Sequence, residues 1–157
     1  MNPKQTITLI GSGLSGPVMA TYLSSLGFSV DVYEARPDMR KNSVPAGRSI
    51  NLALSARGIR ALKDIGAFKK IEPNLIPMRG RMIHDVNGNN NFQPYGQKKS
   101  EVIFSVSRSN LNKVLMSYAE STNKVNFYFN HELRNVDIKK SKLRFNKKQI
   151  PFHVVLG

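Results

Sequence analysis

The feature that most constrains the fold is a glycine-rich turn between an apolar strand and a helix. Thr6 to Ile10 is a short, β-branched, apolar run, which is typical of a buried strand. Gly11-Ser-Gly-Leu-Ser-Gly16 follows, and apolar residues then recur at helical spacing from Pro17 to Leu26, until Gly27 ends the helix. Ser29 to Glu34 is a second strand-like run. This strand, helix and strand form a βαβ unit, which requires the two strands to be parallel.

Gly11, Gly13 and Gly16 have the G-x-G-x-x-G spacing of dinucleotide-binding turns. Gly11 permits the tight turn, Gly13 lets a pyrophosphate approach the backbone, and Gly16 lets the helix pack on the strand. The helix N-terminus offers N–H groups to a phosphate. Glu34 ends the second strand, where its carboxylate can accept hydrogen bonds from a ribose diol and disfavours the 2′-phosphate of NADP. The pattern predicts a dinucleotide site for FAD or NAD; the alternative is a glycine turn with an incidental acid.

The rest of the chain predicts shorter elements and a second layer. Residues 36–48 are interpreted as a loop, and Ser55 is the expected N-cap of a helix that runs to Ile65 and is closed by Gly66. A second helix is expected from Ser107 or Ser109 to about Ser121, and a hairpin turn at Asn87-Gly88. Strands are expected at residues 50–54, 79–86, 102–106, 125–129, 132–138, 142–145 and 152–156.

These elements predict an α/β, Rossmann-like fold with an inserted antiparallel sheet. We expect a parallel sheet led by residues 6–10 and 29–34, with the helix at about 14–26 on one face. We expect a second sheet that includes residues 79–86 and 102–106. The apolar run Val154 to Gly157 ends the chain, and because domains usually end in exposed polar segments, it favours a protein that continues further.

Composition excludes several classes of protein. No apolar run approaches the roughly 18 residues of a membrane helix, and Ile7 to Ile10 is too short for a signal peptide. The absence of cysteine excludes disulfides and thiolate metal sites, and is consistent with a cytoplasmic protein. His84, His131 and His153 lie far apart without ligand spacing, so no metal is expected. The oligomeric state is not indicated.

The net charge of +14 raises the question of nucleic-acid binding. The densest basic segment, residues 139–148, holds six Lys or Arg residues. No aromatic platform is interleaved with them, and the chain contains no nucleic-acid motif. We therefore expect a solvated basic surface without a nucleic-acid partner, and keep a basic nucleic-acid-binding module as the least favoured alternative.

Several longer motifs carry information beyond spacing. They are Val32-Tyr-Glu-Ala-Arg-Pro-Asp38, Gly47-Arg-Ser-Ile-Asn-Leu-Ala-Leu-Ser-Ala-Arg-Gly58, Ile76-Pro-Met-Arg-Gly-Arg-Met-Ile-His84, Pro94-Tyr-Gly96, Ser105-Val-Ser-Arg-Ser-Asn-Leu-Asn-Lys113 and Phe129-Asn-His131. Together they resemble the kynurenine 3-monooxygenases, which are FAD-dependent aromatic hydroxylases. The resemblance is collinear from about Thr6 to about Asn135, and the basic segment 139–148 has no counterpart in it.

The resemblance implies a flavin-hydroxylase type of FAD-binding domain over residues 1–157, with residues of about 76–106 in the inserted sheet on the substrate side. It implies that FAD is bound by Gly11, Gly13, Ser15, Gly16, Tyr33, Glu34, Ala35, Arg36, Ala53, Arg108 and Leu133. It also implies that Arg81 and Tyr95 grip the amino-acid carboxylate of kynurenine. Without the resemblance, Arg81 is most simply a solvated arginine and Tyr95 an aromatic that anchors a turn.

In this family NADPH reduces the flavin, oxygen adds to it, and the resulting hydroperoxide hydroxylates the ring of kynurenine. The protein supplies position and electrostatics for chemistry that belongs to the cofactor. Family members continue beyond residues 152–156 with an Asp-Gly motif and a later Gly-Asp motif. Neither occurs here, so we expect an N-terminal fragment in which no catalytic residue is identifiable and which is inactive alone. The alternative is a non-catalytic dinucleotide-binding remnant.

Overall fold

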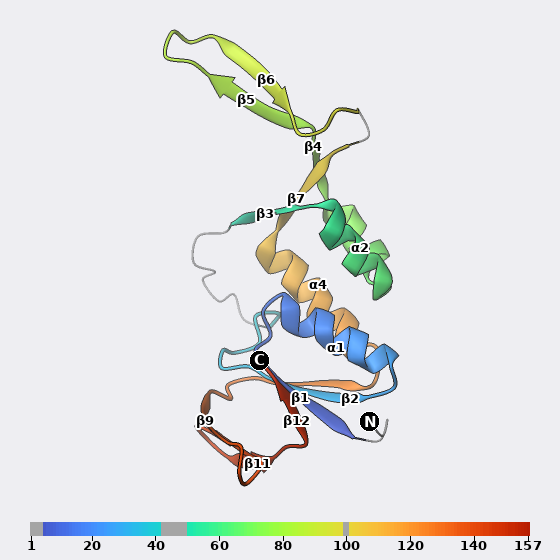
Figure 1. Ribbon diagram of the computed structural model, residues 1–157, viewed down its shortest axis with the longest axis vertical. Helices are drawn as coiled ribbons and strands as arrows, with labels where there is room; N and C mark the ends of the chain where they lie inside the picture. The colour runs from blue at the N-terminus through green and yellow to red at the C-terminus, as the bar shows by residue number, and fades with distance from the viewer. Residues whose placement is uncertain (1–4, 42–49, 99–100) are drawn as a thin grey trace. The chain divides into compact units, whose positions relative to one another are not determined.

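The computed structural model describes residues 5–41, 50–98 and 101–157 (Figure 1). The chain forms two compact units, one made of residues 1–47 and 112–157 and the other of residues 48–111. The second unit is therefore inserted in the sequence of the first. Part of the loop predicted at residues 36–48 lies outside the described residues.

The first unit is built on a parallel sheet with the strand order β12-β1-β2-β8. Its strands are β1 (Thr6–Ile10), β2 (Ser29–Tyr33), β8 (Val125–Tyr128) and β12 (Val154–Leu156). β1 pairs in parallel with β2 in the register Leu9 to Val32, which confirms the predicted βαβ pair. β8 and β12 add to the two sides, also in parallel.

Helix α1 (Ser15–Ser25) lies across one face of this sheet, as predicted (Figure 1). Its Ala20 is fully buried against Val30 and Val32 of β2, which are also fully buried. Burial of such apolar side chains stabilises the unit by roughly 1.5–3 kcal/mol for each large one. Helix α4 (Arg108–Glu120) contributes the buried Ala119 to the same core.

A small antiparallel sheet completes the first unit. It consists of β9 (Leu133–Asp137), β10 (Lys142–Phe145) and β11 (Gln149–Pro151), in the order β11-β10-β9. Leu143 and Phe145 are buried and pack with Tyr33, whereas the alternating residues Lys142 and Arg144 are exposed. Strand periodicity thus places the cations of β10 on the solvent face.

The second unit contains an antiparallel sheet with the order β3-β7-β4. Its elements are β3 (Asn51–Leu54), α2 (Ala56–Asp64), α3 (Phe68–Ile71), the 3-10 helix η1 (Glu72–Asn74), β4 (Ile76–Met78) and β7 (Ile103–Ser107). Helix α2 has nearly the predicted bounds, and Gly66 follows it with φ +76°. Ser55 occupies the N-cap position without a side-chain hydrogen bond. At α4, the Ser107 Oγ accepts from the Asn110 N–H at 3.3 Å, as expected of a cap.

The hairpin of β5 (Gly80–His84) and β6 (Asn90–Pro94) is a separate two-stranded sheet. The prediction that residues 79–86 and 102–106 share a sheet is therefore wrong. β7 is paired on one side with β3 and on the other with β4, so neither edge is left for the hairpin. The predicted turn is confirmed: Gly88 has φ +83°, and its N–H donates to the carbonyl of Asp85 at 3.1 Å.

Candidate dinucleotide site

The glycine turn joins β1 to α1 with close backbone contacts. Gly11 has φ +96°, and its N–H donates to the Tyr33 carbonyl at 2.7 Å. A Cβ added at Gly16 would lie 2.2 Å from the Gly11 carbonyl oxygen, so only glycine fits there. A Cβ added at Gly13 would meet no protein atom within 4 Å. Protein packing therefore requires glycine at position 16 but leaves Gly13 facing open space.

The N-terminus of α1 is electrostatically uncompensated. Its N-cap residue is Leu14, which offers no side-chain hydrogen bond, and the first turn has no acidic residue. The helix runs for 11 residues, so its dipole leaves a partial positive charge at this end. Ser15, the first helical residue, is exposed. Such an end attracts an anion such as a phosphate.

Glu34 is buried, with 5% of its surface exposed, immediately beyond β2. Its Oε2 accepts from the Ser12 N–H at 2.8 Å and from the Ser12 Oγ–H at 3.0 Å. Its Oε1 accepts from the Arg36 N–H at 2.9 Å and from Arg36 Nε at 2.9 Å. Arg36 Nη2 reaches Oε2 at 3.2 Å. The carboxylate thus joins the glycine turn to the segment that follows β2.

These contacts keep Glu34 ionised. Burial alone raises the pKa of this carboxyl, but the hydrogen bonds from Arg36 and from the Ser12 N–H outweigh burial and lower the pKa to about 2. Glu34 is therefore a fixed negative acceptor throughout the physiological pH range.

The neighbours of Glu34 differ in their exposure. Ala35 and Arg36 are exposed, so they can contact a ligand, whereas the Tyr33 ring is only 5% exposed. That ring stacks on Tyr128 with a centroid distance of 4.8 Å. Tyr33 therefore reaches the turn through its carbonyl, and its side chain belongs to the core. Leu133 lies in β9, opposite Phe145.

Two residues of this network were missed in the sequence. Ser12 supplies two donors to Glu34, and its carbonyl accepts from Asn112 Nδ2 at 2.8 Å. Asn112 lies on α4, is 6% exposed, and also contacts the Met39 sulfur at 3.4 Å. Its Oδ1 is buried without a hydrogen-bond partner among the described residues. The only sequence signal was the position of Ser12 inside the glycine motif.

An ion cluster fixes the segment after Glu34. Arg40 Nη2 lies 2.8 Å from Asp38 Oδ2, and Arg40 Nη1 pairs with Glu120 Oε2 at 2.5 Å. The guanidinium also lies 5.6 Å from the centre of the Phe129 ring. The hydrogen bond from the Arg40 side chain lowers the pKa of the Asp38 carboxyl. This cluster ties residues 38–40 to the end of α4.

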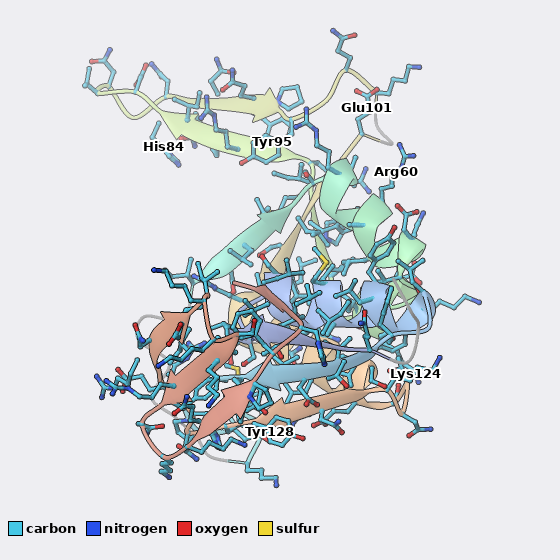
Figure 2. The ribbon with its side chains drawn as sticks, turned by 60° about the horizontal axis from the view of Figure 1, so that its bottom comes forward. Arg60, His84, Tyr95, Glu101, Lys124 and Tyr128 are labelled. Atoms are coloured by element: carbon cyan, nitrogen blue, oxygen red, sulfur yellow. The ribbon has the colours of Figure 1, made fainter. Side chains whose placement is uncertain are left out.

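The remaining candidates belong to the second unit. Ala53 lies in β3 opposite Ser105, and Arg108 begins α4 with its N–H donating to the Ile50 carbonyl at 3.3 Å. Arg81 lies on the exposed hairpin, where its Nε donates to Gln93 Oε1 at 2.7 Å. Tyr95 follows the same hairpin (Figure 2). Its N–H donates to the Arg79 carbonyl at 3.0 Å. Arg81 and Tyr95 are thus brought onto one hairpin.

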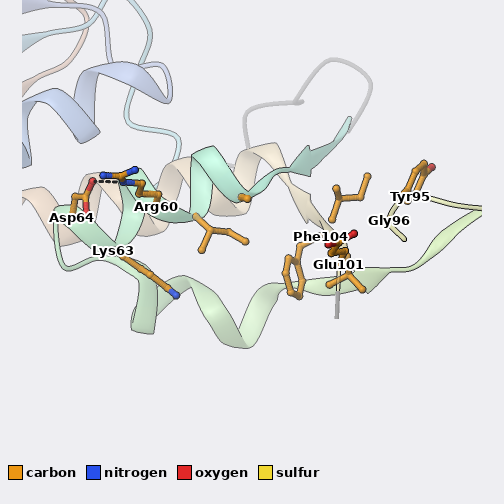
Figure 3. Close-up of a pocket in the computed structure, with 11 residues that line it drawn as sticks. Arg60, Lys63, Asp64, Tyr95, Gly96, Glu101 and Phe104 are labelled. Atoms are coloured by element: carbon orange, nitrogen blue, oxygen red, sulfur yellow. Dashed lines mark ion pairs between the residues drawn. The ribbon is translucent and has the colours of Figure 1, made fainter. Parts of the chain in front are cut away.

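A pocket of about 680 Å³ in this unit lies beside Tyr95 (Figure 3). It is lined by Ala56, Ile59, Arg60, Lys63, Asp64, Tyr95, Gly96, Glu101, Val102, Ile103 and Phe104. The lining combines apolar side chains with charges of both signs, and Arg60 Nε lies 4.0 Å from Asp64 Oδ2. Arg81 is not among the lining residues, so the two predicted substrate residues do not both face this pocket.

Comparison with known proteins bears on both the fold and the family. Residues 9–64 match the model of the NAD(P)-binding Rossmann-like domain. The kynurenine 3-monooxygenase of Legionella pneumophila (strain Corby) is 42% identical over 156 residues, which cover 96% of this chain and 35% of that protein. The enzyme of Cytophaga hutchinsonii is 50% identical over 130 residues, which cover 82% of this chain and 28% of that protein.

This chain is homologous to an N-terminal portion of the kynurenine 3-monooxygenases. It spans about a third of the length of the kynurenine 3-monooxygenases that it matches. The resemblance predicted from the motifs is confirmed. The glycine turn and Glu34 therefore belong to a Rossmann-like domain of the FAD- or NAD(P)-binding kind.

Solved structures confirm the predicted fold class. A tetrameric 2-methyl-3-hydroxypyridine-5-carboxylic acid oxygenase superposes with a TM-score of 0.77 at 17% identity, over 97% of this chain and 38% of that one. The p-nitrophenol 4-monooxygenase of Pseudomonas putida DLL-E4 gives 0.72 at 14% identity, over 94% of this chain and 38% of that one. At such identity these matches establish the α/β architecture with antiparallel sheets.

In residues 5–41, 50–98 and 101–157, no helix is both long and apolar enough to cross a membrane. Within the same ranges, no three His, Cys, Asp or Glu side chains are grouped in a way that could hold a metal ion.

Proposed function

We propose that this chain is the FAD-binding part of an NADPH-using monooxygenase that hydroxylates L-kynurenine to 3-hydroxykynurenine. The observation that carries the proposal is the sequence identity to kynurenine 3-monooxygenases together with an intact glycine turn and a buried, ionised Glu34. When bound, FAD supplies the redox and oxygen chemistry. The chain supplies the site that holds its adenosine half.

The geometry fits a dinucleotide. Gly13 has open space where a Cβ would stand, and its φ is not positive, so neither backbone conformation nor protein packing explains this glycine. Close approach of a pyrophosphate does explain it. The uncapped N-terminus of α1 supplies the complementary partial charge. Glu34 favours a ribose with free hydroxyls over a 2′-phosphate, which supports FAD here and assigns NADPH to a different place.

We propose the further contacts from the family resemblance. Ser15, Gly16 and Gly11 complete the phosphate-binding turn, and Ala35, Arg36 and the Tyr33 backbone lie beside the adenosine. We assign Leu133 to the adenine end, and Ala53 and Arg108 to the flavin path.

Arg81 and Tyr95 are assigned to the carboxylate of kynurenine. A guanidinium can bind a carboxylate through two parallel hydrogen bonds, and Tyr95 Oη can add a third donor. Arg81 has one hydrogen-bonded side-chain partner among the described residues, Gln93, and that amide oxygen is a weaker acceptor than a carboxylate. A substrate carboxylate therefore competes well for its donors.

The test is titration of the purified 157-residue chain with FAD and with ADP, alongside the variants Glu34→Gln and Glu34→Ala. Loss of one or two charge-assisted hydrogen bonds costs about 1.5–3 kcal/mol each, so Glu34→Ala should weaken binding at least about tenfold. If all three proteins bind FAD and ADP with equal affinity, Glu34 does not contact the ligand. A chain that binds neither ligand contradicts the proposed dinucleotide site.

Alone, the chain should form no 3-hydroxykynurenine from kynurenine, NADPH and oxygen. It spans about a third of its relatives, and near-attack geometry among flavin, oxygen and substrate requires more positioning than one end of each molecule. Product from the purified chain, above a control without kynurenine, would show that these residues suffice.

A further inference from the structure

The five donors on Glu34 exceed what its carboxylate can fully satisfy. A carboxylate has about four lone-pair sites, two on each oxygen. The N–H groups of Ser12 and Arg36 take one site on each oxygen, and both are fixed by the backbone. On Oε1 the remaining site is taken by Arg36 Nε at 2.9 Å. On Oε2 the remaining site is shared by Arg36 Nη2 at 3.2 Å and the Ser12 Oγ–H at 3.0 Å.

A ribose presents the same pattern of donors. Its 2′- and 3′-hydroxyl groups lie on adjacent carbons, and each can donate one hydrogen bond to a carboxylate. If Glu34 holds the ribose, as the proposed function requires, the diol needs the two sites that the guanidinium occupies. The Ser12 hydroxyl already shares Oε2 at 3.0 Å, so no spare acceptor remains for a diol while Arg36 stays in place.

We propose that the Arg36 guanidinium is a stand-in for the ribose diol: it keeps Glu34 paired whenever no nucleotide is bound, and it has to swing away before a nucleotide binds fully. This inference rests on the proposed dinucleotide site. The Arg36 side chain is 65% exposed, so it can leave without disturbing the core, whereas the side chain of Glu34 taken alone is only 7% exposed. Arg36 therefore lowers the apparent contribution of the diol to binding, and is a specificity-tuning residue rather than a fixed support.

The competition predicts a particular dependence on the ligand. A partly exposed ion pair is worth up to about a fivefold factor in an equilibrium constant. Removing the guanidinium should therefore raise the preference for a ribose over a dideoxyribose by about two- to fivefold. Lysine carries the same charge as arginine but lacks its two-pronged guanidinium, so it can block at most one lone-pair site of the carboxylate. The ribose preference of the lysine variant should therefore lie between those of wild type and the alanine variant.

The experiment is calorimetric titration of the 157-residue chain with ADP and with 2′,3′-dideoxy-ADP. The proteins are wild type, Arg36→Ala, Arg36→Lys and the control Lys124→Ala. Lys124 is exposed in the same unit, just before the start of β8 and so at the opposite end of the sheet from Glu34. Its removal changes the net charge equally. The measured quantity is the ratio of the two dissociation constants within each protein, which cancels any general effect on phosphate binding.

The expected result is a ratio that is larger in Arg36→Ala than in wild type, intermediate in Arg36→Lys and unchanged in Lys124→Ala. An unchanged or smaller ratio in Arg36→Ala overturns the inference and leaves the dinucleotide site intact. A ratio of one in every protein, with ADP still bound, means that Glu34 does not hold the ribose and overturns both proposals. Absence of ADP binding in every protein also overturns both.

Discussion

Glu34 and Arg81 are both charged residues proposed to bind a ligand, but they differ in burial and in the hydrogen bonds that hold them. Glu34 is 5% exposed and accepts hydrogen bonds from Ser12 and Arg36. Arg81 lies on a hairpin whose two strands are almost entirely exposed, and its described side-chain hydrogen bond is to Gln93. The hydrogen bonds of Glu34 therefore contribute to the stability of the fold. The strand that contains Arg81, by contrast, does not need the Arg81 side chain to keep its structure.

The difference separates two ways of building a binding residue. At Glu34 the cost of burying a charge is offset by hydrogen bonds, so binding and stability are coupled. At Arg81 solvent screens the charge of the free protein. Truncation of Arg81 should therefore lower ligand affinity and leave the free energy of unfolding nearly unchanged. Mutations at Glu34 should therefore change both ligand binding and stability, whereas mutations at Arg81 should change ligand binding alone.

The largest effect is expected for Arg81→Ala on substrate binding. In a protein that carries this chain together with the remainder of the kynurenine 3-monooxygenase sequence, we expect the bound substrate carboxylate and Arg81 to be enclosed. Losing the partner of such a buried carboxylate costs about 2–5 kcal/mol, or roughly 30- to 5000-fold in affinity. FAD content and thermal stability should not change. Titration with kynurenine and with its decarboxylated analogue provides the check. If both proteins discriminate equally against the analogue, Arg81 is not the anchor.

Gly16→Ala and Gly13→Ala should separate a structural glycine from a ligand-facing one. The new Cβ at position 16 would lie 2.2 Å from the Gly11 carbonyl oxygen, and relieving such a clash costs about 1–3 kcal/mol of unfolding free energy. At position 13 the Cβ enters open space, so stability should stay within about 0.5 kcal/mol while ADP affinity falls. Urea denaturation and ADP titration measure the two effects. Equal stability losses would contradict the assignment.

Glu34 should also leave a signature in the pH dependence of stability. Its pKa is lowered to about 2 in the folded chain from an ordinary value near 4.5, so its contribution is complete above pH 4.5 and is lost as the pH falls toward 2. Arg36→Ala removes a major cause of the lowering, so the pKa of Glu34 should rise. The stability difference between wild type and Arg36→Ala should be constant above pH 4.5 and shrink below it. A difference that grows on acidification would be the wrong sign.

The smallest effect is expected on the hairpin itself. Met82 and Phe92 face each other across β5 and β6 with 51% and 52% of their surfaces exposed. Met82→Thr should change the unfolding free energy by no more than about 0.5 kcal/mol. Leu143→Ala, at a fully buried position, should cost about 2–5 kcal/mol in the same denaturant assay. Similar losses at both positions would show that the hairpin is not the independent element described.

Local patterns predicted most of the elements but not all of their pairings. The βαβ start was predictable because glycine spacing, helical periodicity and a terminal acid all lie within residues 6–34. The three-residue strands β4 and β11 were missed because so short a segment shows no alternation. Missing β4 produced the wrong second sheet, since β4 takes the place beside β7 that the hairpin was expected to fill.

The candidate site shows the same limit. Glu34 could be predicted from its position at the end of a strand, whereas Arg81 and Tyr95 were predicted only from the family resemblance. Asn112 was not predictable, because its contact with Ser12 joins residues 100 positions apart. Hydrogen bonds between such distant residues depend on the packed fold, and no local spacing encodes them.

The strand order β12-β1-β2-β8 also sets the order in which the protein can mature on the ribosome. β1 and β2 emerge first, but their outer neighbours come from the far side of the inserted unit. At about 5–20 residues per second, roughly 6–25 s pass between the ends of β2 and β12. Until β8 emerges the nascent βαβ unit has two open strand edges, and the outer edge of β1 stays open until β12 follows. Open edges are sites for chaperone capture or mispairing. The inserted unit has all of its described strands once β7 is made, before β8 emerges.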